Sequence, residues 1–332
     1  MADVSWSRCG GEDCVRLAGL ARDADVRVRV GTSAVAGEFP PMAGRLIRER
    51  DDTCFVPRFA FVEGSTYTVV VEGVAAAVLV CPRPDRLATT EVLDIWPTAH
   101  EVPRNLLRLY VQFSARMSEG YAAAHVRLVN DAGETMVAAL LPTEHELWDS
   151  DRRRLTVLLD PARIKRGLVP HTQSGYPLAI GAPFRLVIDE GFRDAGGNPL
   201  RMGAERRYEV GVDERGRVDP DAWAVTVPAS QSREALVVVF DRPLDHGLLA
   251  RCLHIVGPDG RRIDGTQTIA AGERSWSFTP HDDWAPASHQ LVVDPVLEDL
   301  AGNSVRRVFD RDLTRLEEQP RQAQPVIVSF GV

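Results

Sequence analysis

The sequence predicts an all-β protein made of tandem antiparallel β-sandwich domains, and a repeated turn is the main reason. This five-residue turn occurs as DAGGN from Asp194 and again as DLAGN from Asp299. Leu186 precedes the first turn and Leu291 the second by the same eight positions, each within an alternating apolar run. A recurring unit of about 100 residues built from short strands is typical of a β-sandwich module. The turn therefore predicts a duplicated sandwich.

The composition fits a globular protein with two or three domains. The 332-residue chain is 44% hydrophobic and 26% charged, which is typical of water-soluble domains. Its formal net charge of −8 argues against a general nucleic-acid surface. No apolar run reaches the ~18 residues expected of a transmembrane segment. The first residues lack the basic and apolar regions of a signal peptide, so we expect either a mature extracytoplasmic form or, alternatively, a cytoplasmic protein.

Four pairs of predicted strands follow one another in the same order and support the duplication. Each segment is rich in β-branched and aromatic residues or alternates between apolar and polar residues. The pairs are residues 107–113 with 236–240, 125–129 with 253–256, 154–161 with 274–280, and 184–189 with 289–294. One more strand is expected at residues 326–330, after a linker-like stretch at residues 317–322.

The N-terminal region carries a fainter third copy. A Phe-x-Pro sequence at residues 55–57 matches the one at residues 278–280, and a valine-rich strand follows each. Val69 and Val292 follow their prolines by the same twelve positions. Polar, turn-rich stretches near residues 82–85 and 213–216 mark domain boundaries. We therefore predict an N-terminal divergent sandwich (1–84), a middle domain with enlarged loops (85–213) and a C-terminal domain that includes the last strand (214–332).

These features resemble bacterial immunoglobulin-like domains, the type repeated in S-layer, adhesin-like and other surface proteins. The resemblance lies in the strand order, the Phe-x-Pro sequence before a Tyr-Thr-Val-type strand, and the closing Asp-x-x-Gly-Asn turn. It implies tandem immunoglobulin-like antiparallel sandwiches. It also implies export and a non-enzymatic role, either binding a protein or glycan partner at the bacterial surface or spacing other parts. Such modules serve many purposes, so the resemblance indicates a fold more than an activity.

The middle copy is longer than the C-terminal copy, and its surplus residues are where a site is expected. Leu109 to Asp194 covers 85 positions, whereas Val238 to Asp299 covers 61. The surplus lies around residues 142–150 and 162–182, and loops added to a rigid scaffold often carry function. The candidate ligand-binding residues are Glu144, His145, Glu146 and Trp148 in the first loop, and Arg163, Lys165, Arg166, His171 and Tyr176 in the second.

Three interpretations of these loops remain open. The imidazoles and carboxylates are groups that bind a divalent metal or transfer protons. However, the alternation of residues 144–146 puts two carboxylates on one side of an extended segment and the imidazole on the other. The aromatic rings and cations would instead stack on and pair with a sugar-like or anionic ligand. The third interpretation is a solvated polar loop with no site.

No motif assigns a catalytic residue or a dedicated cofactor. The sequence has no Gly-x-Ser-x-Gly elbow, phosphate-binding glycine loop or His-Glu-x-x-His. The only metal ligands suggested by a motif are the oxygen atoms of the repeated turn, on Asp194, Asn198, Asp299 and Asn303. Calcium needs about six to eight oxygens and one such turn supplies only about three. Local bonding of these side chains to neighbouring amides explains the turn more simply.

The five cysteines leave the redox state open. Cys9 and Cys14 bracket a four-residue loop that a disulfide would close, and Cys54 with Cys81 forms a second candidate bridge. Cys252 lies in an apolar run and is predicted to be a buried thiol. A Cys-x4-Cys spacing without a second Cys or His pair is weak evidence for zinc.

Overall fold

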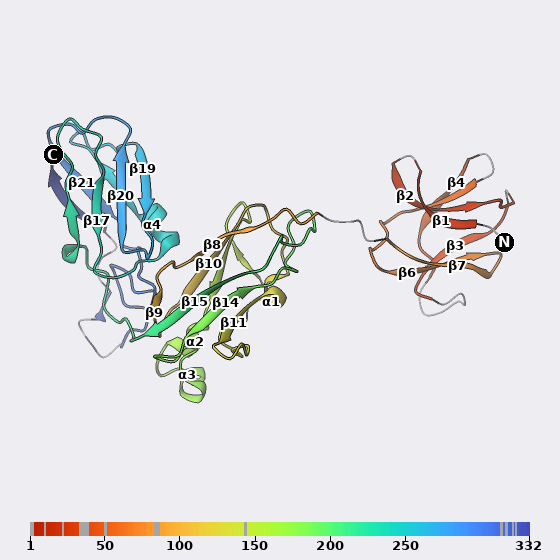
Figure 1. Ribbon diagram of the computed structural model, residues 1–332, viewed down its shortest axis with the longest axis horizontal. Helices are drawn as coiled ribbons and strands as arrows, with labels where there is room; N and C mark the ends of the chain where they lie inside the picture. Colours follow the sequence, from red (N-terminus) through yellow and green to blue (C-terminus); the bar gives the residue numbers. More distant parts are fainter. Residues whose placement is uncertain are drawn as a thin grey trace. The chain divides into compact units, whose positions relative to one another are not determined.

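The protein is all-β and forms two compact units, Met1–Asp85 and Arg86–Val332. The computed structural model describes residues 3–9, 11–21, 23–32, 40–49, 52–82, 87–142, 145–312, 315, 318–320, 322 and 324–332 (Figure 1). None of the described helices has the length and apolar character needed to cross a membrane. The predicted boundary at residues 82–85 falls largely on residues outside the described part of the chain.

The first unit is a sandwich of two antiparallel sheets. One sheet has the order β1 (Asp3–Cys9), β2 (Glu12–Ala18), β5 (Asp52–Pro57) and β4 (Gly44–Glu49), and the other has the order β3 (Val26–Val30), β6 (Thr66–Val71) and β7 (Val74–Val80). Alternate side chains of each strand point inward. Val15, Leu17, Val28, Phe55, Tyr67 and Val69 form the core between the sheets.

The second unit begins with the middle sandwich. Its first sheet has the order β12 (Leu147–Trp148), β13 (Arg154–Leu158), β10 (Arg108–Phe113) and β8 (Val92–Trp96). The second has the order β11 (Val126–Asn130), β14 (Phe184–Ile188), β15 (Ala204–Gly211) and β9 (Glu101–Pro103), with β9 parallel to β15. Short helices α1 (Ala122–His125), α2 (Pro161–Ile164) and α3 (Val169–Ser174) lie in the connections.

The C-terminal sandwich completes the second unit. One sheet has the order β16 (Ala224–Thr226), β17 (Leu236–Val239), β20 (Ser275–Pro280) and β19 (Gly265–Ile269). The other has the order β18 (Leu253–Val256), β21 (Ser288–Val293) and β22 (Val326–Gly331). The single-turn helix η1 (Pro220–Ala222) precedes β16, and α4 (His246–Cys252) precedes β18. The last strand, predicted at residues 326–330, is β22.

All three sandwiches have the same strand order. When the strands of each are lettered A to G along the chain, and β9 is set aside, one sheet is A-B-E-D and the other contains C-F-G. This is the order of constant-type immunoglobulin domains. The predicted fold class, tandem immunoglobulin-like antiparallel sandwiches, is confirmed. Descent of the three from one duplicated domain stays a prediction.

The Phe-x-Pro match between the first and last sandwiches lies at the same structural position. Gly44 in β4 and Gly265 in β19 stand opposite the prolines of the two sequences. A Cβ atom on Gly44 would lie 2.5 Å from Cζ of Phe55, and one on Gly265 would lie 2.4 Å from Cζ of Phe278. In both sandwiches the phenylalanine ring occupies the space that a side chain on strand D would need.

The two sandwiches of the second unit share buried apolar contacts. Leu300, from the turn of the C-terminal sandwich, belongs to the hydrophobic core of the middle sandwich. The backbone N–H of Leu107 donates to the carbonyl of Leu300 at 2.9 Å. Asn105 and Glu214 exchange two hydrogen bonds, at 2.7 and 2.9 Å. The predicted boundary at residues 213–214 therefore lies inside one compact unit, and the three-domain division stays a prediction.

Buried polar groups reinforce this interface. The Tyr110 hydroxyl donates to Asp245 at 2.8 Å, and the Arg108 guanidinium pairs with Glu298 and lies 3.4 Å from Asp245. Glu273, only 1% exposed, accepts the backbone N–H of Thr98 at 2.9 Å. Because buried charges are costly unless they are paired, these contacts fix how the two sandwiches meet.

We expect Gly265→Ala to destabilise the second unit. The added methyl group would lie 2.4 Å from a phenylalanine ring and 2.5 Å from the carbonyl oxygen of Thr279. Overpacking of this kind costs about 1–3 kcal/mol in the free energy of unfolding, which urea denaturation would measure. Gly331→Ala is the matched control, because a methyl group added there would meet no atom within 4 Å. Equal stability of the two variants would contradict this account of strand D.

Candidate functional site

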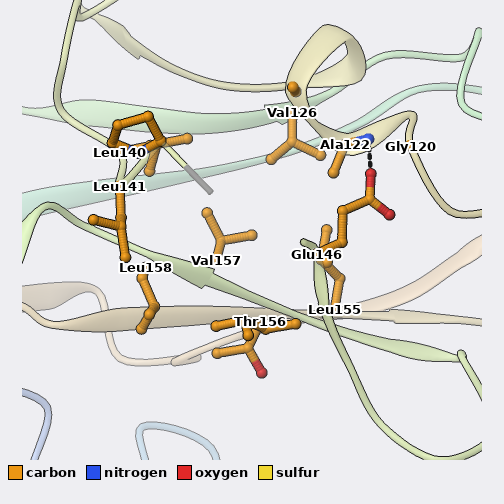
Figure 2. Close-up of a pocket in the computed structure, with 13 residues that line it drawn as sticks. Gly120, Ala122, Val126, Leu140, Leu141, Glu146, Leu155, Thr156, Val157 and Leu158 are labelled. Carbon is orange, nitrogen blue, oxygen red and sulfur yellow. Dashed lines mark hydrogen bonds between the residues drawn. The ribbon is translucent and has the colours of Figure 1, made fainter. Parts of the chain in front are cut away.

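The main cavity of the second unit lies between the two sheets of the middle sandwich, beside the first enlarged loop. Its volume is about 540 Å³, within the range of small-molecule sites. Figure 2 shows Val126 and Ala122 facing Val157 and Leu155 across the space, with Leu140 and Leu141 on one side and Glu146 on the other. Nearly all of the lining is apolar, and Glu146 is its one ionisable residue among those described.

The cavity occurs where the middle sandwich departs from the other two. Strand D has six residues in the first unit, as β4, and five in the C-terminal sandwich, as β19. In the middle sandwich strand D is β12, which has only two residues. Leu140 and Leu141 still pair with Leu159 and Leu158, and Leu140 to Pro142 and Glu146 line the cavity. The surplus loop that the sequence indicated therefore adjoins the cavity.

Glu146 is held at the cavity wall by two neutral donors. Its Oε1 accepts the backbone N–H of Ala122, the first residue of α1, at 2.6 Å. Its Oε2 accepts the indole N–H of Trp148 at 2.7 Å. Figure 2 shows the first of these bonds. A carboxylate at the start of a helix satisfies a donor that has no partner within the helix. Glu146 therefore joins α1 to β12 across one end of the cavity.

Among the other candidates of the first loop, Trp148 contacts Glu146 through its indole N–H. The Trp148 ring packs against Phe113 and Phe192, at centroid distances of 5.8 and 6.0 Å. His145 is exposed at a bend and does not line the cavity. Glu144 lies outside the described residues. Trp148 is partly buried against the core of the middle sandwich.

Arg163 and His171 are engaged in holding the second loop together. The Arg163 guanidinium donates to the carbonyls of Ala138, Gly175 and Tyr176, at 2.9, 3.1 and 2.8 Å. Nδ1 of His171 lies 2.5 Å from the carbonyl oxygen of Arg163. Arg163 thus satisfies backbone carbonyls before α2 and after α3, and His171 contacts a carbonyl of α2.

Lys165, Arg166 and Tyr176 contact the segment at the junction with the C-terminal sandwich. The Lys165 ammonium lies 4.5 Å from the centre of the Phe309 ring, and Nε of Arg166 donates to Asp310 at 2.8 Å.

The face of Tyr176 is covered by the guanidinium of Arg104 at 4.2 Å. Its hydroxyl bonds to Asp213 and to Arg215, and Asp213 in turn pairs with Arg104 at 2.7 Å. Burial opposes the effect, but the two guanidinium groups lower the pKa of Asp213 to about 2. Tyr176 is thus part of an ion-pair network that joins residues of the middle sandwich to the segment after β15.

The two repeated turns are built from the same hydrogen bonds. Oδ1 of Asp194 accepts the N–H groups of Gly196 and Asn198, both at 2.9 Å. Oδ1 of Asp299 accepts those of Ala301 and Asn303, also at 2.9 Å. The Asn side chain of each turn donates back to the same carboxylate. These oxygens satisfy the turn itself, as the simpler sequence interpretation proposed.

The surroundings of the two aspartates set their pKa values in opposite directions. Burial raises the pKa of Asp299 to about 7, despite the bonds from Asn303 and the guanidinium of Arg242 at 3.5 Å. Burial acts the same way on Asp194, but the bonds from Asn198 and the Thr90 hydroxyl outweigh it and hold the pKa of that carboxyl below its usual range. The same turn structure therefore holds one aspartate with a raised pKa and one with a lowered pKa.

No group of three His, Cys, Asp or Glu side chains suited to a metal ion occurs within the described ranges of the chain. All five cysteines are buried. Cys9, Cys14 and Cys54 lie in one small cluster with Val56, whereas Cys81 belongs to the main core of the first unit. The structure thus groups Cys54 with Cys14 rather than with Cys81. Cys252 is buried, as predicted.

The sequence did not identify the apolar walls of the cavity. They come from α1, β11, the segment at residues 140–142 and β13, which are far apart in the sequence. The one available signal was the run Leu140-Leu141-Pro142, an apolar stretch that leads directly into a polar loop. A cavity beside a shortened strand cannot be predicted from the sequence, because its position depends on how the neighbouring strands fold together.

Comparisons with known proteins show no family match. No protein-family model matches the chain, and no curated protein matches it.

Three solved structures similar to the chain are a marsupial T cell receptor, a Bacteroides ovatus protein and a surface layer protein. The receptor shares 9% identity, with 100% of both chains covered and a TM-score of 0.22. The second is SGBP-B of the mixed-linkage glucan utilization locus, in complex with a mixed-linkage heptasaccharide (10% identity, 88% of this chain and 59% of that chain, TM-score 0.18). The third, SbsC domains 4–9, shares 11% identity over 97% of this chain and 42% of that chain, with a TM-score of 0.20. The fold assignment rests on the strand order described above.

We expect Arg163→Lys to destabilise the second unit by about 1.5–3 kcal/mol. Lysine has one ammonium group and cannot reproduce the planar set of bonds to three carbonyls. The matched control is Arg166→Lys, which alters a half-exposed ion pair with Asp310 and is expected to cost about 1 kcal/mol or less. Urea denaturation measures both variants. If Arg163→Lys is as stable as the control, Arg163 does not anchor this loop.

We expect the stabilising contribution of Asp299 to fall as pH rises. Its folded-state pKa, about 7, lies above its ordinary value of 3.8, so between these pH values the folded state binds more protons than the unfolded state. The advantage of wild type over Asp299→Asn should therefore decrease by up to about 1.4 kcal/mol per pH unit between pH 5 and pH 7.

Asp194→Asn provides the control for this titration. Because the pKa of Asp194 is lowered, its carboxyl is ionised in both states above about pH 5. The difference in unfolding free energy between wild type and Asp194→Asn should then stay constant over the same range. A flat profile for Asp299→Asn as well would show that burial does not hold the Asp299 proton.

Proposed function

We propose that this chain is a non-enzymatic, extracytoplasmic binding protein of tandem immunoglobulin-like sandwiches, in which the middle sandwich carries the binding site. The observation that carries this proposal is the apolar cavity of about 540 Å³ between its two sheets. Concave, mostly apolar sites of this size with few polar groups are typical of ligand binding.

The bonding of the polar candidates supports binding rather than catalysis. Arg163 and His171 are occupied by backbone carbonyls. A catalytic group needs to reach a substrate with a free donor, acceptor or nucleophile. These side chains instead define the shape of the loops around the cavity.

The cavity favours a partner that presents an apolar group. A glycan partner would require exposed aromatic faces, and the rings of Trp148 and Tyr176 are already packed against protein side chains. The rigid junction with the C-terminal sandwich would hold the cavity at a fixed position on the second unit, which also suits a spacer role at the bacterial surface.

Two measurements on cells of the source organism test this proposal. Protease added to intact cells should degrade the chain, because the chain is expected to lie outside the cytoplasm.

The second measurement tests binding at the cavity. Purified wild-type chain should be retained on cells that lack it, and Ala122→Phe, which fills the cavity, should reduce retention at least tenfold. Ala124→Phe is the matched control, since this exposed residue of α1 does not line the cavity.

Each measurement has an outcome that contradicts the proposal. A chain that resists protease until the cells are lysed is not extracytoplasmic. Equal retention of Ala122→Phe and wild type would show that the cavity is not the binding site. Circular dichroism and urea denaturation of both phenylalanine variants check that each is folded.

A further inference from the structure

Among the described residues, the walls of the cavity are mostly apolar on both sides, and the carboxylate of Glu146 interrupts them. Val126 from β11 and Val157 from β13 approach from opposite sheets, and Leu140 and Leu141 close one end. Glu146 stands at the other end (Figure 2). A ligand that fills this space therefore meets hydrocarbon along most of its length and a negative charge at one point.

Part of the strand backbone beside the cavity is already paired, and β13 has β12 on one side and β10 on the other. On β13, Thr156 pairs with Leu147, and the carbonyl of Leu158 accepts the N–H of Leu141 at 2.9 Å. On β11, the carbonyl of Leu128 accepts the N–H of Met136 at 2.9 Å. The groups that a ligand inside the cavity meets are its apolar walls and the carboxylate.

Glu146 retains both negative charge and acceptor capacity. Each carboxylate oxygen accepts one bond, from Ala122 and from Trp148, and neither donor carries a formal charge. A carboxylate has about four acceptor sites in total. A cationic N–H donor could therefore add to Glu146 without displacing either bond, and charge-assisted bonds are about twice as strong as neutral ones.

We infer that the cavity binds a small amphiphilic amine, with its apolar body between Val126 and Val157 and its protonated amine against Glu146. This inference rests on the proposed binding function and names the ligand class. An anionic ligand of the same shape would be repelled by Glu146, and a neutral one would forgo the charge-assisted bond. The chain's net charge of −8 also favours the approach of a cation.

Three probes with one body and different head groups test the inference: phenylbutylamine, phenylbutanol and phenylbutyrate. Their dissociation constants at pH 7 would be measured by NMR, following the methyl signals of Val126 and Val157. We expect the amine to bind at least tenfold more tightly than the alcohol, and phenylbutyrate to bind most weakly. Equal binding of amine and alcohol, or preference for phenylbutyrate, would overturn the inference.

Variants of the residues that line the cavity test which group produces the preference for the amine. Glu146→Gln should remove the preference for the amine and leave binding of the alcohol within about twofold, because glutamine keeps the size of the side chain without its charge. Ala122→Phe should abolish binding of all three probes, and Ala124→Phe should leave it unchanged. Persistence of the amine preference in Glu146→Gln would show that another group recognises the cation.

A salt titration of wild type is independent of how well Glu146→Gln folds. Raising ionic strength from about 0.01 to 1 M shortens the screening length about tenfold, so the amine preference should shrink while alcohol binding persists. A preference insensitive to salt would contradict recognition by charge.

The probe and cell-retention experiments can fail separately. If no probe binds but the cell-retention result holds, the ligand class is wrong and the binding role stands. If the probes bind as expected but Ala122→Phe does not affect retention, the ligand class stands and the binding role on cells is wrong.

Discussion

The hydrogen-bonded turn at residues 299–303 is the contact on which the second unit depends. Asp299 satisfies the N–H groups of its own turn, which allows the backbone there to be buried without unpaired donors. That burial places Leu300 in the core of the neighbouring sandwich. The related turn from Asp194 has the same bonds but does not serve as a joint between sandwiches. A local motif that closes a turn thus becomes, in one of its two copies, the junction between domains.

The three sandwiches show how one strand order accommodates different surfaces. The first and last have a full strand D next to a phenylalanine that excludes any side chain at Gly44 or Gly265. The middle sandwich reduces strand D to two residues and opens a space between the sheets. Shortening one edge strand is a simple way to create a cavity, because the central strands and their hydrophobic core keep their positions. The structural difference of the middle sandwich therefore lies in one edge strand and its loop.

The sequence predicted the fold well because its signals were local. The repeated turn, the alternating strands and the Phe-x-Pro match depend on neighbours within a few positions, and each lies where expected. The candidate site was harder to predict. Arg163 and His171 of the second loop bond to backbone carbonyls, whose positions only the folded chain defines. The apolar walls of the cavity come from segments far apart in the sequence, and Glu146 is the one sequence candidate that lines it among the described residues.

The contact between Lys165 and Phe309 has a practical consequence. Lys165 is the only lysine of the chain, and its ammonium lies over an aromatic ring at the junction between the two sandwiches. An amine-reactive dye therefore has one side-chain target, which happens to adjoin the joint. Fluorescence from that position would report any opening of the joint without the introduction of a new cysteine.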